Sequence, residues 1–105
     1  MRRVVITGAG TINPLGADVP ATFRAMQAGR SAIGALTCRD VERLTVKIGA
    51  EVSGFDATAH FTRAQLPLLD RFTQFALVSA REAVAQAGLE LSDAEQLRAG
   101  VALGT

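Results

Sequence analysis

The sequence is poor in cysteine and has no long hydrophobic run. Its single cysteine, Cys38, has no second cysteine with which to form an internal disulfide and no nearby histidine with which to bind a metal. The apolar run behind Met1 lasts only through Ile6, too short for a signal peptide, and no other stretch is long enough to span a membrane. These absences predict a cytoplasmic protein without a metal site or a disulfide.

An excess of charge of one sign is also missing. The 105 residues include 11 basic and 10 acidic side chains, which give a formal net charge of +1 with no block of like charges. This balance argues against a nucleic-acid partner and against a membrane surface. The hydrophobic content of 49% is enough to provide a core for one small domain.

The sequence opens instead with a β-branched run that breaks into glycines, RRVVITGAGTINPLG, from Arg2 to Gly16. Many nucleotide-binding loops begin in this way. A dinucleotide fingerprint, however, needs a third glycine where Asn13 stands, and Pro14 removes an amide donor from the loop. The next helix is predicted to begin only near Asp18, too late for its amides to meet a phosphate at the first two glycines. We therefore expect a tight, crowded turn and no cofactor.

Two stretches have the composition of strands that are buried on both faces of a parallel sheet. Arg2–Thr7 is rich in β-branched residues without polar alternation, and Gly100–Gly104 has the sequence GVALG. Between them, Ser31–Glu42 is predicted to be a polar connection, and Thr45–Val52 an exposed strand or hairpin arm. With helices between the strands, this order predicts an α/β fold with right-handed crossovers.

Helix signals are strongest in the second half of the chain. A first helix is expected between the cap residue Asp18 and Gly29, and the longest helix between Asp70 and Ala87. Ser92–Glu95 matches a capping box for one more short helix. The long helix carries a stripe of small residues that lets another backbone approach closely: Ala76, Ala80, Ala83 and Ala87. We expect this helix to be mostly buried in the complete protein.

Six blocks of sequence follow one another along the whole chain: RRVVITGAGTINPLG, FRAMQAGRSAI, KIGAEVSGFD, LDRFTQFAL, AREAVAQAGL and RAGVALGT. Together they resemble the amino-terminal portion of a β-ketoacyl-acyl-carrier-protein synthase of the elongating, type II kind. That family's chains are about fourfold longer. Residues 1–105 are therefore expected to form only a truncated first part of the amino-terminal half, and we expect this piece not to fold stably by itself.

The resemblance implies a thiolase-like fold, in which two similar α/β halves are stacked into layers, and a homodimer or a heterodimer with a second ketosynthase-like chain. It also implies decarboxylative Claisen condensation with an acyl carrier protein as partner. In that chemistry a cysteine thiolate takes the acyl group, two histidines assist decarboxylation, and backbone amides hold the oxyanion. All of these groups are expected beyond Thr105, so no residue of this chain is predicted to be catalytic.

Cys38 and His60 carry side chains that can act in catalysis. Cys38 lies in a polar connection rather than on a sharp strand-to-helix elbow, and no base partner is visible beside it. His60 precedes a short turn predicted at Thr62–Leu66, where Pro67 interrupts the helical pattern. We interpret Cys38 as a non-catalytic thiol and His60 as a surface or capping histidine.

The segment TRAQLPLLDR corresponds to the turn where these synthases often carry basic side chains that meet the acidic carrier protein. Arg63 and Arg71 are therefore predicted to contact the carrier. The sequence departs from the family pattern at Ala64, Pro67 and Leu68, where positive charge would be expected. The leucines of this turn indicate either a protein contact or local core packing.

Two other functions remain open on the sequence alone. A non-catalytic homologue of the chain-length-factor type would share these blocks but lack the nucleophile further along the chain. A nucleotide-dependent reductase would need an acidic residue for the adenine ribose, for which only Glu51 and Asp56 in the exposed insert are available.

Overall fold

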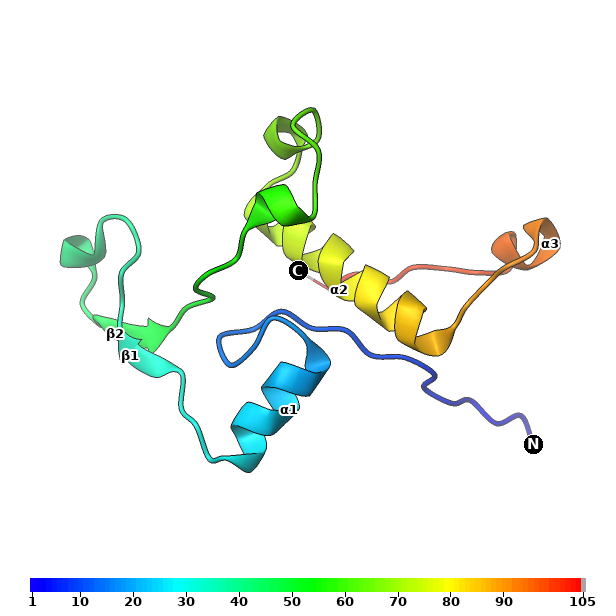
Figure 1. Cartoon of the computed structure of the whole chain (residues 1–105), viewed down its shortest axis with the longest axis horizontal. Helices are drawn as coiled ribbons and strands as arrows, with labels where there is room; N and C mark the ends of the chain where they lie inside the picture. The colour runs from blue at the N-terminus through cyan, green and yellow to red at the C-terminus, as the bar shows by residue number, and fades with distance from the viewer. Residues whose placement is uncertain (105) are drawn as a thin grey trace.

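The computed structural model describes residues 1–104, and its elements are arranged around one long helix. The elements are α1 (Val19–Gln27), β1 (Ile33–Ala35), β2 (Ile48–Ala50), α2 (Arg71–Ala87) and α3 (Asp93–Gln96), with 3₁₀ turns at Val41–Arg43, Ala57–Ala59 and Leu66–Leu68. In Figure 1 the amino-terminal segment passes beside α2, and the β1–β2 hairpin lies at the opposite end of the molecule from α3.

Helix α1 has the predicted boundaries because its end signals are local. The Asp18 carboxylate accepts a hydrogen bond from the Ala21 amide at 2.7 Å, and a proline occupies the first turn. Gly29, with φ of +66°, follows the last turn. Ala25 is buried, whereas Phe23 on the same helix is 59% exposed. The helix therefore keeps an apolar side that the described residues leave uncovered.

Helix α2 also confirms its prediction. The Asp70 carboxylate accepts a hydrogen bond from the Thr73 amide at 2.7 Å, and Gly88 ends the helix with φ of +58°. The predicted capping box is present in α3, where the amide of Ser92 donates to the Glu95 carboxylate at 2.9 Å. All three α-helices of the described chain were therefore encoded by their own end residues.

The turn before α2 differs from the prediction in one detail. The amide of Leu66 donates to the Thr62 carbonyl at 3.1 Å, which confirms a turn over Thr62–Leu66. Pro67, however, does not simply interrupt the helical pattern, because it lies inside a second turn, the 3₁₀ turn Leu66–Leu68. A proline is tolerated there because the first residues of a helical turn have no carbonyl partner for their amides.

The described residues form one sheet, a two-stranded antiparallel hairpin of β1 and β2, in which Gly34 pairs with Gly49. Strand β2 lies within the predicted Thr45–Val52 hairpin arm. The prediction of Ser31–Glu42 as a polar connection was wrong in part, because β1 lies inside it. The isoleucine and alanine of β1 suit a strand only once β2 supplies a partner of matching length.

The two predicted buried strands are absent from the described chain. Arg2–Thr7 and residues 100–104 are extended but pair with no other described segment. A strand exists only where a neighbour accepts and donates its backbone hydrogen bonds, and residues 1–104 provide no such neighbour for either segment. Their apolar side chains are accordingly open to solvent, with Val4 95% and Val101 97% exposed. The predicted parallel sheet with its crossovers is likewise not formed within these residues.

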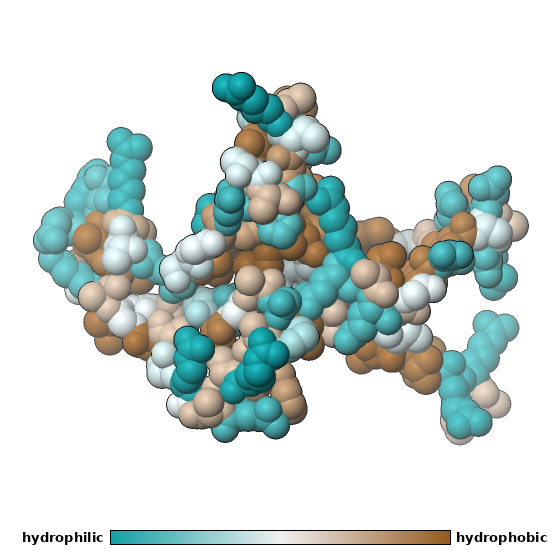
Figure 2. Space-filling view, in the orientation of Figure 1, coloured by the Kyte–Doolittle hydropathy of each residue, from teal (hydrophilic) through white to brown (hydrophobic). Residues whose placement is uncertain are grey.

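The molecule is expanded for its length. Its radius of gyration is 17.1 Å, whereas a domain of this size is expected to have about 13 Å. Its accessible surface is 8766 Å², against about 5,600 Å² for a folded monomer of this mass. Ala25 and Phe61 are the buried apolar residues among those described, and apolar side chains (brown) are spread over the surface in Figure 2. Much of the apolar surface is therefore uncovered.

None of the helices between residues 1 and 104 is both long and apolar enough to cross a membrane.

Candidate functional site

The glycine loop, residues 8–19, lies directly against α2. A Cβ atom at Gly10 would collide with the backbone carbonyl oxygen of Ser79, and one at Gly8 with that of Ala83. Gly8 also approaches the Ala87 side chain. The predicted crowded packing is confirmed, and the close approach of a backbone is found at Ala83 and Ala87 of the predicted stripe.

Two polar side chains of α2 bind the backbone amides of the loop. The Glu82 carboxylate accepts from the amide of Thr11 at 2.8 Å and from the amide of Val19, the first residue of α1, at 2.7 Å. The Gln86 side-chain oxygen accepts from the amide of Ala9 at 2.6 Å. These are the donors that a phosphate would need in a nucleotide-binding loop. Here a carboxylate of the protein itself occupies two of them.

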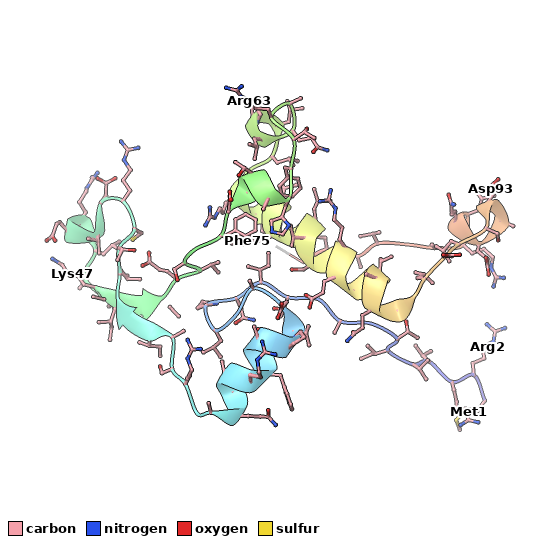
Figure 3. The ribbon with its side chains drawn as sticks, viewed as in Figure 1. Met1, Arg2, Lys47, Arg63, Phe75 and Asp93 are labelled. Carbon is pink, nitrogen blue, oxygen red and sulfur yellow. The ribbon has the colours of Figure 1, made fainter. Side chains whose placement is uncertain are left out.

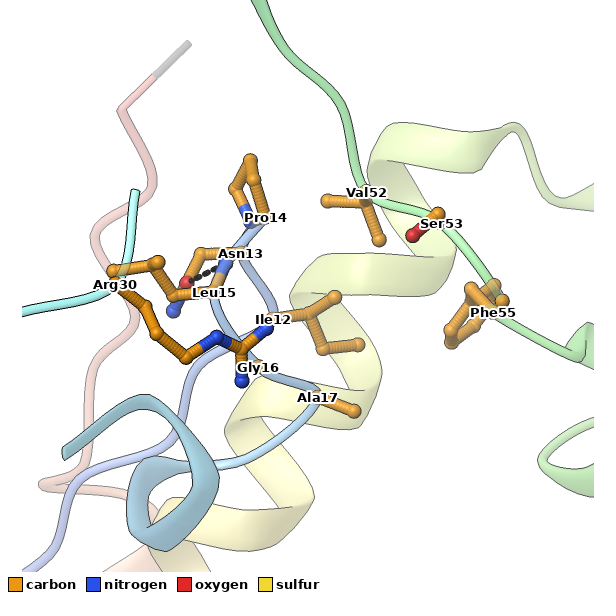
Figure 4. A pocket seen from close by; sticks show the side chains of 11 residues that line it. Ile12, Asn13, Pro14, Leu15, Gly16, Ala17, Arg30, Val52, Ser53 and Phe55 are labelled. Atoms are coloured by element: carbon orange, nitrogen blue, oxygen red, sulfur yellow. Dashed lines mark hydrogen bonds between the residues drawn. The ribbon is translucent and has the colours of Figure 1, made fainter. Parts of the chain in front are cut away.

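Asn13 organises the tip of the loop. Its backbone exchanges two hydrogen bonds with Gly16, at 3.0 and 3.1 Å, around a two-residue turn. Its side-chain oxygen accepts from the Leu15 amide at 2.8 Å, a contact drawn as a dashed line in Figure 4. Its side-chain nitrogen donates to the hydroxyls of Thr11, at 3.0 Å, and Thr22, at 2.8 Å. The residue that breaks the dinucleotide fingerprint therefore builds the turn.

The sequence analysis did not predict the roles of Glu82 and Gln86, although one signal for them was present. Glu82 and Gln86 are four residues apart, so they lie on one face of the helix, beside the small residue Ala83. Polar acceptors beside a small-residue stripe suit a backbone that approaches closely and brings unsatisfied amides with it.

A hollow of about 200 Å³ lies between this loop and the segment that follows β2. Its lining, shown in Figure 4, consists of Ile12–Ala17, Arg30 and Val52–Phe55. Polar and apolar atoms contribute about equally to the lining, and its polar side chains are those of Asn13, Arg30 and Ser53. No nucleophile paired with a base lies in it. Within residues 1–104, no group of three or more histidine, cysteine, aspartate or glutamate side chains is placed to hold a metal.

The two predicted carrier-contact residues are held in different ways. The guanidinium carbon of Arg71 lies 5.1 Å from the ring centroids of both Phe55 and Phe75, a cation–π arrangement. Arg63 lies at the outer tip of the turn before α2, pointing away from the body of the protein in Figure 3. The structure thus gives Arg71 a fixed position and leaves Arg63 extended from the surface. Their contact with a carrier protein stays a prediction.

Histidine 60 belongs to an aromatic cluster on the same side. The His60 ring is stacked on Phe55, with centroids 5.4 Å apart, and the His60 carbonyl accepts from the Arg81 guanidinium at 3.1 Å. The nearby Asp56 carboxylate binds the hydroxyl and the amide of Thr58, which lower its pKa, and His60 adds a smaller lowering effect. This arrangement suits a surface and capping role.

The remaining candidates lie apart from the loop. Cys38 is exposed. Glu51 binds the backbone amide of Thr37 at 2.7 Å and its hydroxyl at 3.0 Å, and the amide hydrogen bond is the main reason why the pKa of Glu51 is lowered. Glu51 therefore braces the hairpin, and Asp56 binds its own turn, where neither carboxylate is free to recognise a ribose.

Comparison with known proteins gives one consistent family. The sequence model described as "Beta-ketoacyl synthase, N-terminal domain" matches residues 1–105. The chain is 38% identical over 104 residues to the 3-oxoacyl-[acyl-carrier-protein] synthase 2 of Staphylococcus aureus (strain N315), which covers 99% of this chain and 25% of that protein. It is 42% identical over 103 residues to nodulation protein E of Rhizobium sp. (strain N33), covering 98% of this chain and 25% of the relative.

A solved structure agrees with the sequence relatives. The crystal structure of a beta-ketoacyl synthase from Burkholderia phymatum STM815 superposes with a TM-score of 0.68 at 28% identity. The superposition covers 89% of this chain and 23% of that one. The chain thus spans about a quarter of the length of the relatives that it matches.

Proposed function

The chain belongs to the β-ketoacyl synthase family, and from this membership we propose that it is the amino-terminal part of a 3-oxoacyl-acyl-carrier-protein synthase. The observation that carries the proposal is the family match over residues 1–105. The α/β, thiolase-like fold class is confirmed by the superposition on a family structure and by the mixed helices and strands. The activity, substrates and partners given below are those proposed for the complete protein.

The proposed reaction is the extension of an acyl chain by two carbons. The malonyl group on the carrier protein loses carbon dioxide, and the resulting enolate carbon attacks the acyl thioester held on a cysteine of the enzyme. A carbon–carbon bond forms, the carbon–sulfur bond to the enzyme breaks, and the thiolate leaves. We place the cysteine, the two histidines and the oxyanion amides outside residues 1–105. The proposal includes a dimeric, cytoplasmic enzyme that needs no metal.

A condensation assay with radioactive malonyl-carrier protein tests the reaction. The complete protein is expected to turn over, and the complete Cys38→Ser variant is expected to do so at the parent rate, because Cys38 is exposed and lies in no built site. The 105-residue chain alone is expected to be inactive. Turnover abolished by Cys38→Ser would show that the nucleophile has been placed wrongly.

The same assay distinguishes the non-catalytic homologue. A chain-length-factor-type protein would give no turnover alone and would carry a residue other than cysteine at the downstream elbow. A reductase is disfavoured, because the loop amides that would bind a dinucleotide phosphate are bound to Glu82. Titration with NADPH or NADH is expected to show no micromolar binding, and such binding would revive that alternative.

We further propose that Arg63 and Arg71 contact the acyl carrier protein. In support, Arg63 extends from the tip of the turn, and Arg71 is held in place by Phe55 and Phe75. Arg63→Ala is expected to raise the KM for carrier-bound substrate about threefold and to weaken its salt dependence, with kcat unchanged. Arg71→Ala is expected to raise the same KM and also to lower the melting temperature, because its cation–π contacts are lost.

Arg98→Ala is the matched control, because Arg98 is exposed and follows α3, whereas this turn precedes the other end of α2. An unchanged KM for both Arg63→Ala and Arg71→Ala would show that this turn does not contact the carrier protein. The proposed reaction would not be affected by that result.

A further inference from the structure

One side chain of α2 binds both ends of residues 11–19, the part of the glycine loop that leads into α1. Thr11 and Val19, eight positions apart in sequence, donate their amides to the two oxygens of the same Glu82 carboxylate. The turn around Asn13 lies between these two points. A single carboxylate on α2 therefore holds the two ends of this segment together, as the hydrogen bonds between paired strands hold the ends of a longer hairpin.

The partners of Glu82 are backbone groups rather than a cation. The ion pair found among residues 1–104 is Lys47–Glu42, so no described lysine or arginine lies within ion-pair distance of Glu82. The carboxylate is half-buried, and one of its partners is the first amide of α1, where a negative charge interacts favourably with the helix dipole. A hydrogen bond to an ionised acceptor is about twice as strong as one between neutral groups.

We propose that Glu82 is a positioning residue whose charged carboxylate sets the conformation of residues 11–19 and with it one wall of the hollow lined by Ile12–Ala17. The inference rests on these contacts and is independent of the reaction that the protein catalyses. Gln86 has a supporting role, because its neutral oxygen holds a single amide, that of Ala9.

The substitution Glu82→Gln removes the negative charge of the side chain with little change in its shape. Glu82→Gln keeps the length of the side chain, but its amide has only one oxygen, and its NH₂ group would face the second backbone donor. We expect the amides of Thr11 and Val19 to exchange with solvent about tenfold faster in this variant. Hydrogen exchange of the complete protein, followed by mass spectrometry on peptides covering residues 8–13 and 17–22, measures this. A peptide within α2 should keep its parent rate.

The control is Glu90→Gln, which makes the same chemical change at an exposed position after α2 and should leave both loop peptides unchanged. In Glu82→Ala, sodium formate is expected to restore slow exchange at both peptides, whereas formamide, or sodium chloride at equal ionic strength, should not. A merely space-filling side chain would show no such preference for a small anion. Parent-like exchange in Glu82→Gln, or equal rescue by formamide, would overturn the proposal.

If neither Glu82 variant is soluble, hydrogen exchange of the parent protein still tests the proposal. No backbone carbonyl among residues 1–104 accepts from the amides of Thr11 and Val19, so these amides are expected to exchange slowly only if Glu82 holds them. Rates typical of an open loop at these two positions in the parent would overturn the proposal without any substitution.

Discussion

The glycine loop and the two terminal segments all lie outside the named helices and strands, apart from Val19 at the start of α1, yet their backbones differ in the partners that they find. The loop over residues 8–19 has side-chain acceptors for its amides and a helix surface shaped to receive it. Arg2–Thr7 and residues 100–104 have neither and leave their side chains in solvent. The difference teaches that a segment is ordered by the partners available to its backbone, whereas its own composition sets only which partners it needs.

The strongest test of this comparison uses the 105-residue chain alone. Because its apolar segments lack partners and its surface is far larger than that of a folded monomer, we expect no cooperative thermal transition by calorimetry or circular dichroism. Soluble, monomeric chain that melts in one sharp transition would contradict this expectation. It would mean that the packed loop and α2 suffice for a stable unit.

The next largest effect is expected at the contact between the loop and α2. In the complete protein, Gly10→Ala would push a Cβ into the Ser79 carbonyl, which belongs to the helix backbone and cannot rotate away. We expect a loss of about 3 kcal/mol in the free energy of unfolding, measured by urea denaturation.

Gly34→Ala is the control for this substitution. A Cβ at Gly34 meets nothing within 4 Å, so we expect a change within about 0.5 kcal/mol. Equal midpoints for the two variants would show that the loop does not lie against α2 in the complete protein.

A smaller effect reports on the outer side of α2. Ala80 is exposed among the described residues, although it belongs to the predicted small-residue stripe. If the rest of the complete protein covers this side, Ala80→Leu should overpack it and destabilise the complete protein by about 1 to 3 kcal/mol. Arg98→Ala is the surface comparison. If both variants melt at the parent temperature, the side of α2 that carries Ala80 is exposed to solvent in the complete protein. That result would refute the expectation that the helix is mostly buried.

The smallest effect is expected at the start of α2, where the interaction is local. The side chain and the amide of Thr73 hold the pKa of the Asp70 carboxyl below its ordinary value, and the amide donates to the carboxylate at 2.7 Å. The stabilisation is therefore complete above the ordinary carboxyl pKa and is lost as the pH falls through the lowered value of the folded state.

Asp70→Ala should lower the melting temperature at neutral pH by about 2 °C and should remove this part of the acid dependence. Thermal melts of the parent and the variant over a series of acidic pH values measure both quantities. A constant difference between the two proteins at all pH values would show that the charge of Asp70 plays no part in capping.

The family and the helices could be predicted from the sequence because their signals are local or cumulative. Six short blocks in fixed order predict membership of the β-ketoacyl synthase family, as the family match confirms. Asp18, Asp70 and Ser92 cap helices through residues no more than three positions away, so their contacts are written into adjacent sequence.

The strands and the organisation of the loop were decided by tertiary structure. A strand requires a partner, and the composition of Arg2–Thr7 does not reveal whether the described chain contains one. For the same reason β1 could not be recognised without β2, with which it pairs. The loop depends on Glu82, which is 71 residues from Thr11 and 63 from Val19. No local pattern joins residues so far apart, because only the folding of α2 against the loop brings that carboxylate to the amides that it binds.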